Sequence, residues 1–194
     1  MLNKPNSKPK ALLNLENIRG LNREHVPIRK AQLHDDPIAD SCIWLEQALN
    51  LDLINPTAAV LSTANLNSKP DARIILLKEI TELGYVFYTN YDSAKGSDLN
   101  ENPQAQLTFY WDQLSRQLRI AGKVEKVAAI KSDDYFNSRP IGSQISAVIS
   151  QQSKLINNRE ELEQKVIDYK KQHGDSPIAR PQNWGGYILI PDYI

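Results

Sequence analysis

The sequence lacks several features that identify particular classes of protein. Its 194 residues include one cysteine, Cys42, so an internal disulfide is impossible and we expect a reducing, cytoplasmic compartment. No run of about 18 apolar residues occurs, and the start, MLNKPNSKPK, has no apolar stretch typical of a secretory signal. The formal net charge is zero. We therefore expect no membrane-spanning helix and no basic surface for nucleic acid.

The usual catalytic arrangements are equally scarce. The three histidines lie far apart in the sequence, and no cysteine or histidine pair has metal-ligand spacing, so we expect no metal site. Neither common type of glycine-rich phosphate loop is present. Paired acids such as Asp133 and Asp134 fall on polar faces or at helix starts, where capping and solvation explain them. A protein without an evident acid, base or nucleophile can take its chemistry from a cofactor.

The middle of the chain has the pattern of an antiparallel sheet. Short runs rich in β-branched and aromatic residues alternate with turn-forming segments, which predicts strands at 58–63, 72–80, 85–90, 105–111, 116–127 and 185–191. Such short connections favour antiparallel pairing, because parallel strands need a long crossover. Closure into a barrel would remove the exposed edges of the sheet.

Helices are predicted on both sides of this region in the sequence. The expected ranges are 37–49, a short helix within 91–103, 128–137, 141–150 and 158–173. Asp36 and Asn158 stand where helix caps are needed, and Glu161 is placed to complete a capping box with Asn158. Residues 1–35 are interpreted as a mobile arm and residues 36–194 as a single domain.

The first candidate binding segment is RIILLK, residues 73–78. An apolar strand between two cations can lie along a flat ligand, with each cation near a separate anionic group. Arg73 and Lys78 are an odd number of positions apart, however, so a regular strand would point them to opposite faces. Either the strand twists or bulges, or the cations serve different pockets. The alternative is an ordinary core strand with solvated ends.

The second candidate lies in YFNSRPIGSQISAVISQQS. Tyr135, Arg139 and Ser143 are spaced by four residues each, so helical geometry would place them near one face. An arginine with two hydroxyls can bind a phosphate through charge-assisted hydrogen bonds. Pro140 is tolerated if one helix ends at Arg139 and Ile141 opens the next. The alternative is a helix–turn–helix surface with an exposed arginine.

Taken together, the motifs resemble the pyridoxine/pyridoxamine 5′-phosphate oxidase family, FMN-dependent enzymes that make pyridoxal 5′-phosphate. The matching segments, in order, are WLEQAL, RIILLK, VFYTN, SAKG, RQLRIAGKVEKV, DYFNSRPIGSQI, SQQS and NWGGY. The resemblance spans roughly residues 37–194. It implies a mainly β fold with flanking helices, the FMN-binding split β-barrel, and a homodimer with FMN held between the subunits.

The resemblance also implies roles for individual residues. Contacts to FMN are implied for Arg73 (its phosphate), Ile74, Ile75, Leu76, Leu77, Lys78, Tyr88, Thr89, Lys95, Gln117, Gln152 and Ser153. The phosphate of the vitamin B6 substrate is assigned to Lys78, Tyr135, Arg139 and Ser143. FMN would accept a hydride from the C4′ carbon of pyridoxamine or pyridoxine 5′-phosphate, and O2 would reoxidise the flavin. No catalytic side chain is implied.

Three departures from the family pattern leave alternatives open. Ala94 stands where the family usually has a second basic residue, and no counterpart of an N-terminal Arg–Glu–Tyr segment is evident. The family's Arg-Leu-His-Asp-Arg motif is also missing from the sequence, which would lower turnover. One alternative is a non-catalytic FMN or B6-phosphate binding protein. The other is a related flavin oxidase with a phenazine-like substrate.

Overall fold

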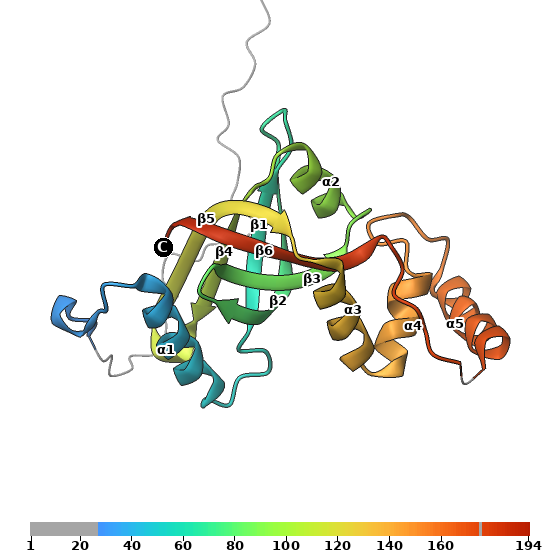
Figure 1. Cartoon of the computed structure of the whole chain (residues 1–194), viewed down its shortest axis with the longest axis horizontal. Coiled ribbons are helices and arrows are strands. Elements are labelled where there is room, and N and C mark those ends of the chain that lie inside the picture. The colour runs from blue at the N-terminus through green and yellow to red at the C-terminus, as the bar shows by residue number, and fades with distance from the viewer. Residues whose placement is uncertain (1–26, 175) are drawn as a thin grey trace, which may run out of the picture.

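The computed structural model describes residues 27–174 and 176–194, which form a closed six-stranded barrel with flanking helices (Figure 1). Neighbours around the barrel follow the order β1-β2-β3-β6-β5-β4, and every pair is antiparallel. The strands are β1 (Ala58–Ala64), β2 (Pro70–Thr81), β3 (Gly84–Asn90), β4 (Gln104–Trp111), β5 (Arg116–Lys126) and β6 (Trp184–Tyr193). The predicted antiparallel barrel is confirmed.

The helices lie at opposite sides of the barrel. In Figure 1, α1 (Pro37–Leu49) is on one side, while α3 (Ala129–Ser138), α4 (Ile141–Ile149) and α5 (Arg159–His173) group together on the other. A short helix, α2 (Ala94–Glu101), precedes β4. Two single 3₁₀ turns, η1 (Lys30–Gln32) and η2 (Asp112–Leu114), complete the described elements. None of the described helices is long and apolar enough to cross a membrane.

Two predicted caps begin their helices as expected, although one capping box is wrong. The Asp36 carboxylate accepts a hydrogen bond from the backbone N–H of Ile38 at 2.9 Å, and Asn158 accepts one from that of Glu161 at 2.8 Å. The Glu161 carboxylate does not return the bond to Asn158. Its two oxygens instead accept from Lys165 Nζ at 2.7 Å and from Asn157 Nδ2 at 2.8 Å.

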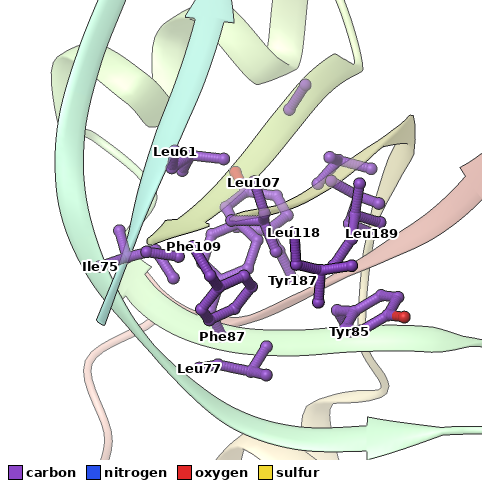
Figure 2. Close-up of a cluster of buried hydrophobic side chains, with 14 of the residues drawn as sticks. Leu61, Ile75, Leu77, Tyr85, Phe87, Leu107, Phe109, Leu118, Tyr187 and Leu189 are labelled. Carbon is purple, nitrogen blue, oxygen red and sulfur yellow. The ribbon is translucent and has the colours of Figure 1, made fainter. Parts of the chain in front are cut away.

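Side chains point alternately into and out of the barrel along each strand, and the inward-pointing apolar ones form the core. On β2, Ile75 and Leu77 are buried, whereas Ile74 and Leu76 face outwards and are exposed. Figure 2 shows buried side chains of the strands meeting inside the barrel, among them Leu61, Phe87, Leu107, Phe109 and Leu189. This period of two is the one expected for a sheet with one face buried.

A second apolar cluster joins the helices to the barrel. Its buried members include Phe136 of α3, Ile145 of α4 and Trp184 at the start of β6. Val166 and Tyr169 of α5 pack against it while remaining partly exposed. The helices α3, α4 and α5 therefore pack around the start of β6.

Strand β2 carries Arg73 and Lys78, whose odd spacing would point them to opposite faces of a regular strand. The strand contains an irregularity at the second of these residues. Its pairing with β3 shifts register between Leu77 and Glu79, so Lys78 is the additional residue of a bulge. The bulge interrupts the strict alternation beyond Leu77. Of the two possibilities that the sequence left open, a bulged strand is the one observed.

The proposed N-terminal arm falls mostly outside the described residues, which begin at residue 27. Residues 27–35 are exposed and contain η1. The first long helix starts at Pro37. The division into an arm and a single domain at residue 36 stays a prediction.

Candidate functional site

A cavity of about 810 Å³ opens between the barrel and the helices on its side. Strands β2 and β3 form one wall, and α3, α4 and α5 form the opposite one. Most of the residues singled out from the sequence line it, namely Arg73, Ile74, Ile75, Leu76, Lys78, Tyr88, Thr89, Lys95, Tyr135, Arg139, Ser143 and Gln152. The two candidate segments, more than fifty residues apart in the chain, thus face the same cavity.

Three predicted residues lie elsewhere. Leu77 points into the barrel core, because side chains alternate along β2 and Leu77 falls on the inward-facing side. It is 3% exposed. Gln117 lines a separate hollow of about 310 Å³ together with Trp44 and Arg119. Ser153 is exposed next to Gln152, with its backbone in the left-handed region at a φ of 68°. The side chains of these three residues do not reach the large cavity in this chain.

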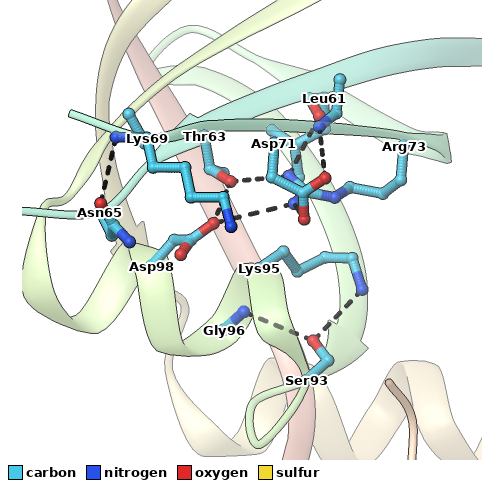
Figure 3. Close-up of polar contacts among 12 residues, drawn as sticks. Leu61, Thr63, Asn65, Lys69, Asp71, Arg73, Ser93, Lys95, Gly96 and Asp98 are labelled. Atoms are coloured by element: carbon cyan, nitrogen blue, oxygen red, sulfur yellow. Dashed lines mark hydrogen bonds and ion pairs between the residues drawn. The ribbon is translucent and has the colours of Figure 1, made fainter. Parts of the chain in front are cut away.

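Lys95 is a buried ammonium held only by neutral groups. Its Nζ donates to Gln152 Oε1 at 2.9 Å and to Ser93 Oγ at 3.2 Å, the latter shown in Figure 3. Within the described ranges, no carboxylate lies within 4.0 Å of it. Burial and the nearby Arg73 charge lower the pKa of Lys95 to about 8, while Asp71 raises it slightly.

The helix α2 explains why Lys95 points this way. Ser93 caps the helix, and its hydroxyl accepts a hydrogen bond from the backbone N–H of Gly96 at 3.4 Å. The same hydroxyl donates to the carbonyl of Asn90 at 2.7 Å, which ties the cap to the end of β3. Lys95, in the first turn, is thus directed towards Gln152 and the cavity.

Arg73 has a different electrostatic environment. Its Nη2 lies 2.6 Å from Asp71 Oδ2 and 3.8 Å from Asp98 Oδ2, and its Nη1 donates to Thr63 Oγ1 at 2.8 Å (Figure 3). The hydrogen bond from Arg73 lowers the pKa of Asp71. Arg73 is therefore partly neutralised by acids, whereas Lys95 is not.

Arg139 is a second cation without an acidic partner. It stands between α3 and α4, where Pro140 separates the helices as predicted. In the part of the chain that the structure describes, no carboxylate lies within 4.0 Å of its guanidinium, and its buried Nη1 has no hydrogen-bond partner. Burial lowers the pKa of Arg139. A buried donor without a partner suits an anion brought by a ligand.

Aromatic rings surround this arginine. The guanidinium carbon lies 4.6 Å from the ring centroid of Trp184, and the rings of Tyr88 and Tyr135 stack at 3.9 Å. Burial is the main cause that raises the pKa of Tyr88 to about 12. The hydroxyl of Tyr88 therefore keeps its proton at neutral pH.

Sequence reasoning missed several lining residues. Trp184 belongs to the NWGGY motif, but no role was assigned to it. On α5, Leu162 and Val166 stand one turn apart; that helix has no buried residue, yet both side chains form part of the cavity wall. Their helical spacing was visible, but the surface that they face depends on tertiary packing. Across the described residues, no group of three or more His, Cys, Asp or Glu side chains is placed to hold a metal.

Comparison with known proteins gives one consistent family. The family model described as "Pyridoxamine 5'-phosphate oxidase" matches residues 45–173. The pyridoxine/pyridoxamine 5′-phosphate oxidase of Legionella pneumophila (strain Lens) is 45% identical over 160 residues, which are 82% of this chain and 74% of that protein. The enzyme of that name from Synechocystis is 46% identical over 165 residues, or 85% and 77% of the two chains.

Solved structures agree on the fold. PhzG from Burkholderia lata 383, in complex with tetrahydrophenazine-1-carboxylic acid, superposes with a TM-score of 0.78 at 25% identity and covers 83% of this chain and 79% of its own. A pyridoxamine 5′-phosphate oxidase-related, FMN-binding protein from Nostoc punctiforme has a TM-score of 0.65 at 16% identity, with 80% and 81% covered, and shares the fold. On the family match and the identity to its relatives, this chain belongs to the pyridoxamine 5′-phosphate oxidase family of oxidoreductases.

Proposed function

We propose that this protein is an FMN-dependent oxidase of pyridoxamine or pyridoxine 5′-phosphate that uses O2 as acceptor. The observation behind the proposal is a single cavity lined by the buried Lys95 and the half-buried Arg139, neither of which has a carboxylate partner within 4.0 Å among the described residues. Flavin mononucleotide and the substrate each bring one phosphate. Two phosphorylated ligands would therefore match the two cations.

The residues present fit FMN. Lys95, with its neutral partners Gln152 and Ser93, offers an ammonium to a phosphate, and Arg73 lines the same cavity. The exposed aliphatic face of β2, Ile74 and Leu76, can support a flat ring. A volume of about 810 Å³ is within the range of ligand sites. We assign cofactor contacts to these residues and to Ile75, Lys78, Tyr88 and Thr89, while those predicted for Leu77 and Ser153 would be made by their backbone.

The substrate phosphate is assigned to the other cation. Arg139, Tyr135 and Ser143 line the cavity together, and Lys78 joins them from the bulge of β2. Their donors are suited to a phosphate dianion. Because Arg139 belongs to the link between α3 and α4, the phosphate would be held against the helical wall and the pyridine ring directed towards β2 and β3.

The protein's contribution would be binding and orientation. When bound, FMN supplies the redox chemistry, which is acceptance of a hydride from the substrate's C4′ carbon followed by reoxidation with O2 to give peroxide. Tyr88 and Tyr135 form an aromatic wall beside the substrate, and the high pKa of Tyr88 keeps its hydroxyl a hydrogen-bond donor. Two ligands held in fixed orientation react as if at high effective concentration.

The test begins with the purified chain and FMN. Flavin retained after gel filtration and identified as FMN would support the cofactor assignment. Pyridoxamine 5′-phosphate, O2 and water should then give pyridoxal 5′-phosphate, ammonia and peroxide in equal amounts. A flavin-loaded sample without turnover would reject the oxidase and favour the non-catalytic binding protein.

Arg139→Ala tests the substrate site separately. We expect KM for pyridoxamine 5′-phosphate to rise about 30-fold or more, because a charge-assisted contact is lost, while FMN affinity is retained. Arg159→Ala is the matched control, since Arg159 is largely exposed and forms a surface ion pair with Glu163 away from the cavity. Equal kinetics for Arg139→Ala and the parent protein would point to a substrate without phosphate.

That outcome would favour the second candidate, a flavin oxidase with a phenazine-like substrate. Its supporting observation is the structural similarity to PhzG, with a TM-score of 0.78. The grouping of Arg139 with the hydroxyls of Tyr135 and Ser143 in one cavity favours the phosphorylated substrate, because a phosphate has more acceptor oxygens for these donors than the carboxylate of a phenazine acid. Tetrahydrophenazine-1-carboxylic acid, tested in the same assay, separates the two.

We further propose a homodimer with FMN between the subunits. Gln117 supports it, since this predicted cofactor contact lines a hollow outside the large cavity and would reach FMN only from a second copy. Sedimentation of the FMN-loaded protein should give twice the mass of one chain. In mixed dimers, a Gln117→Ala subunit and a Lys95→Met subunit should restore one intact site. A cytoplasmic location is also proposed, on the single cysteine alone.

A further inference from the structure

We propose that Trp184 is a positioning residue that holds the Arg139 guanidinium in the orientation needed to bind the substrate phosphate. The inference deepens the proposed function and rests on it. Its basis is the contact between these two side chains, with the guanidinium carbon 4.6 Å from the centroid of the indole ring. Both residues line the large cavity.

Trp184 is itself firmly placed. It is 6% exposed and stands at the first position of β6, where it pairs with Asn90 of β3. Its backbone N–H donates to the carbonyl of Pro181 at 3.0 Å, and its carbonyl accepts from Arg180 Nη1 at 2.6 Å. The ring therefore provides a rigid surface that comes from the barrel, whereas Arg139 comes from the helical wall.

The aromatic neighbours reinforce this placement. The indole lies nearly parallel to the rings of Tyr88 and Tyr135, at interplanar angles of 14° and 7°. Phe136 meets it edge to face, with centroids 5.4 Å apart. Tyr135 is itself a predicted phosphate ligand, so one indole contacts two members of the substrate group.

An aromatic ring suits this task better than a carboxylate. A cation–π contact fixes the plane of a guanidinium while leaving its N–H groups free to donate to an anion. An acid at the same place would bind those N–H groups and compete with the phosphate, as Asp71 does with Arg73. Arg139 fits this description, because its Nη1 is buried without a partner among the described residues.

The experiment compares phosphorylated and unphosphorylated ligands on the full chain loaded with FMN. Calorimetry would measure Kd for pyridoxal 5′-phosphate and for pyridoxal with the parent protein, Trp184→Leu and Trp184→Phe. We expect Trp184→Leu to raise Kd for pyridoxal 5′-phosphate about tenfold and Trp184→Phe about threefold, since a smaller ring retains part of the contact. The Kd values for pyridoxal and for FMN should stay unchanged.

Three further measurements separate positioning from general packing. Trp111→Phe is the control for the loss of a buried indole, because Trp111 lies in the barrel core, away from both cavities; it should not alter the preference for the phosphorylated ligand. In an Arg139→Ala background, Trp184→Leu should weaken pyridoxal 5′-phosphate no further. In turnover of pyridoxamine 5′-phosphate by Trp184→Leu, KM should rise and kcat should not fall.

The outcomes are distinct. If the parent protein prefers the phosphorylated ligand and Trp184→Leu keeps that preference, or if its effect adds fully to that of Arg139→Ala, the positioning role is wrong and the proposed function stands. If the parent protein shows no preference for the phosphorylated ligand, both the positioning role and the proposed function are wrong. Should Trp184→Leu fail to fold, Trp184→Phe in the same double-mutant comparison decides the matter with its smaller expected change.

Discussion

Arg73 and Asp71 form an ion pair at the rim of the cavity, with Nη2 and Oδ2 2.6 Å apart. They are two residues apart on the same strand, and the guanidinium is bound at its other amino group by Thr63 and the carbonyl of Leu61. Arg73, which the family resemblance assigns to the FMN phosphate, is thus already engaged with an acid. Among the described residues, Lys95 has no such acidic partner, because its ammonium donates only to the neutral Gln152 and Ser93.

Asp71→Asn should therefore strengthen FMN binding. Removing the carboxylate leaves the Arg73 charge available to a phosphate, and we expect affinity to rise about two- to fivefold at low ionic strength. The gain should shrink at high salt, because the Asp71 side chain is 55% exposed. Fluorescence quenching of FMN measures the affinity. Weaker binding by the variant would show instead that Asp71 is needed to hold Arg73 in place.

FMN binding should depend on the protonation of Lys95. Its pKa of about 8 lies below the ordinary 10.5, so the free protein loses this charge above about pH 8. A phosphate dianion favours the ammonium, and binding above that pH requires proton uptake. FMN affinity should be flat between about pH 7 and 7.5 and then fall by about tenfold per pH unit above 8. Lys95→Met should abolish the slope, while Lys165→Met, on the exposed face of α5, should retain it.

The same group affects the stability of the flavin-free protein. Because the folded-state pKa is depressed, the unfolded chain binds more protons between about pH 8 and 10.5. The free energy of unfolding contributed by Lys95 should therefore rise with pH across this window. Urea unfolding of the parent protein and of Lys95→Met would measure the difference. A contribution that decreased with pH would contradict the lowered pKa.

Two glycines in helices should respond oppositely to alanine. A Cβ on Gly96 of α2 would lie 1.9 Å from the carbonyl oxygen of Tyr91, so Gly96→Ala must displace backbone beside Lys95. We expect a loss of roughly 2 kcal/mol or more in the free energy of unfolding. A Cβ on Gly142 of α4 would meet nothing within 4 Å, and Gly142→Ala should stabilise by up to about 1 kcal/mol. Similar changes in the free energy of unfolding for the two variants, measured by urea unfolding, would be inconsistent with the close approach of Gly96 to the carbonyl of Tyr91.

A buried pair connects α1 to the barrel, Ser41 and Tyr85, whose hydroxyl oxygens lie 2.7 Å apart. Ser41 donates its proton to the carbonyl of Ile38, so Tyr85 must donate to Ser41. Ser41→Ala would leave the tyrosine hydroxyl buried without an acceptor and should cost about 1–3 kcal/mol. Tyr85→Phe should cost less, about 0.5–1.5 kcal/mol. The reverse order in thermal or urea unfolding would refute this assignment of the donor.

Much of the fold could be predicted from local patterns. Strand bounds agree to within a few residues, because alternation and turn chemistry are properties of adjacent residues. Pro140 separates α3 from α4 as predicted, because its ring prevents a continuous helix. The capping box at Glu161 failed, since the local pattern does not show that side chains of Lys165 and Asn157 engage the carboxylate instead.

The candidate site was only partly predictable. Ordered motifs identified most of the lining residues, but not the positions of Leu77, Gln117 and Ser153 outside the cavity. Spacing raised a bulge in β2 only as one possibility, and it did not show which side of α5 faces the cavity, since both features depend on what packs against the element.

The sequence by itself determined which segments are strands and helices and which side chains could bind phosphate, because these properties depend on residues adjacent in the chain. Only the tertiary structure decided which cations are paired. Asp71 partly neutralises Arg73, whereas Arg139 meets the ring of Trp184, 45 positions along the chain. Barrel closure brings the start of β6 beside α3 and α4, and contacts between such distant segments are set by packing rather than by local pattern.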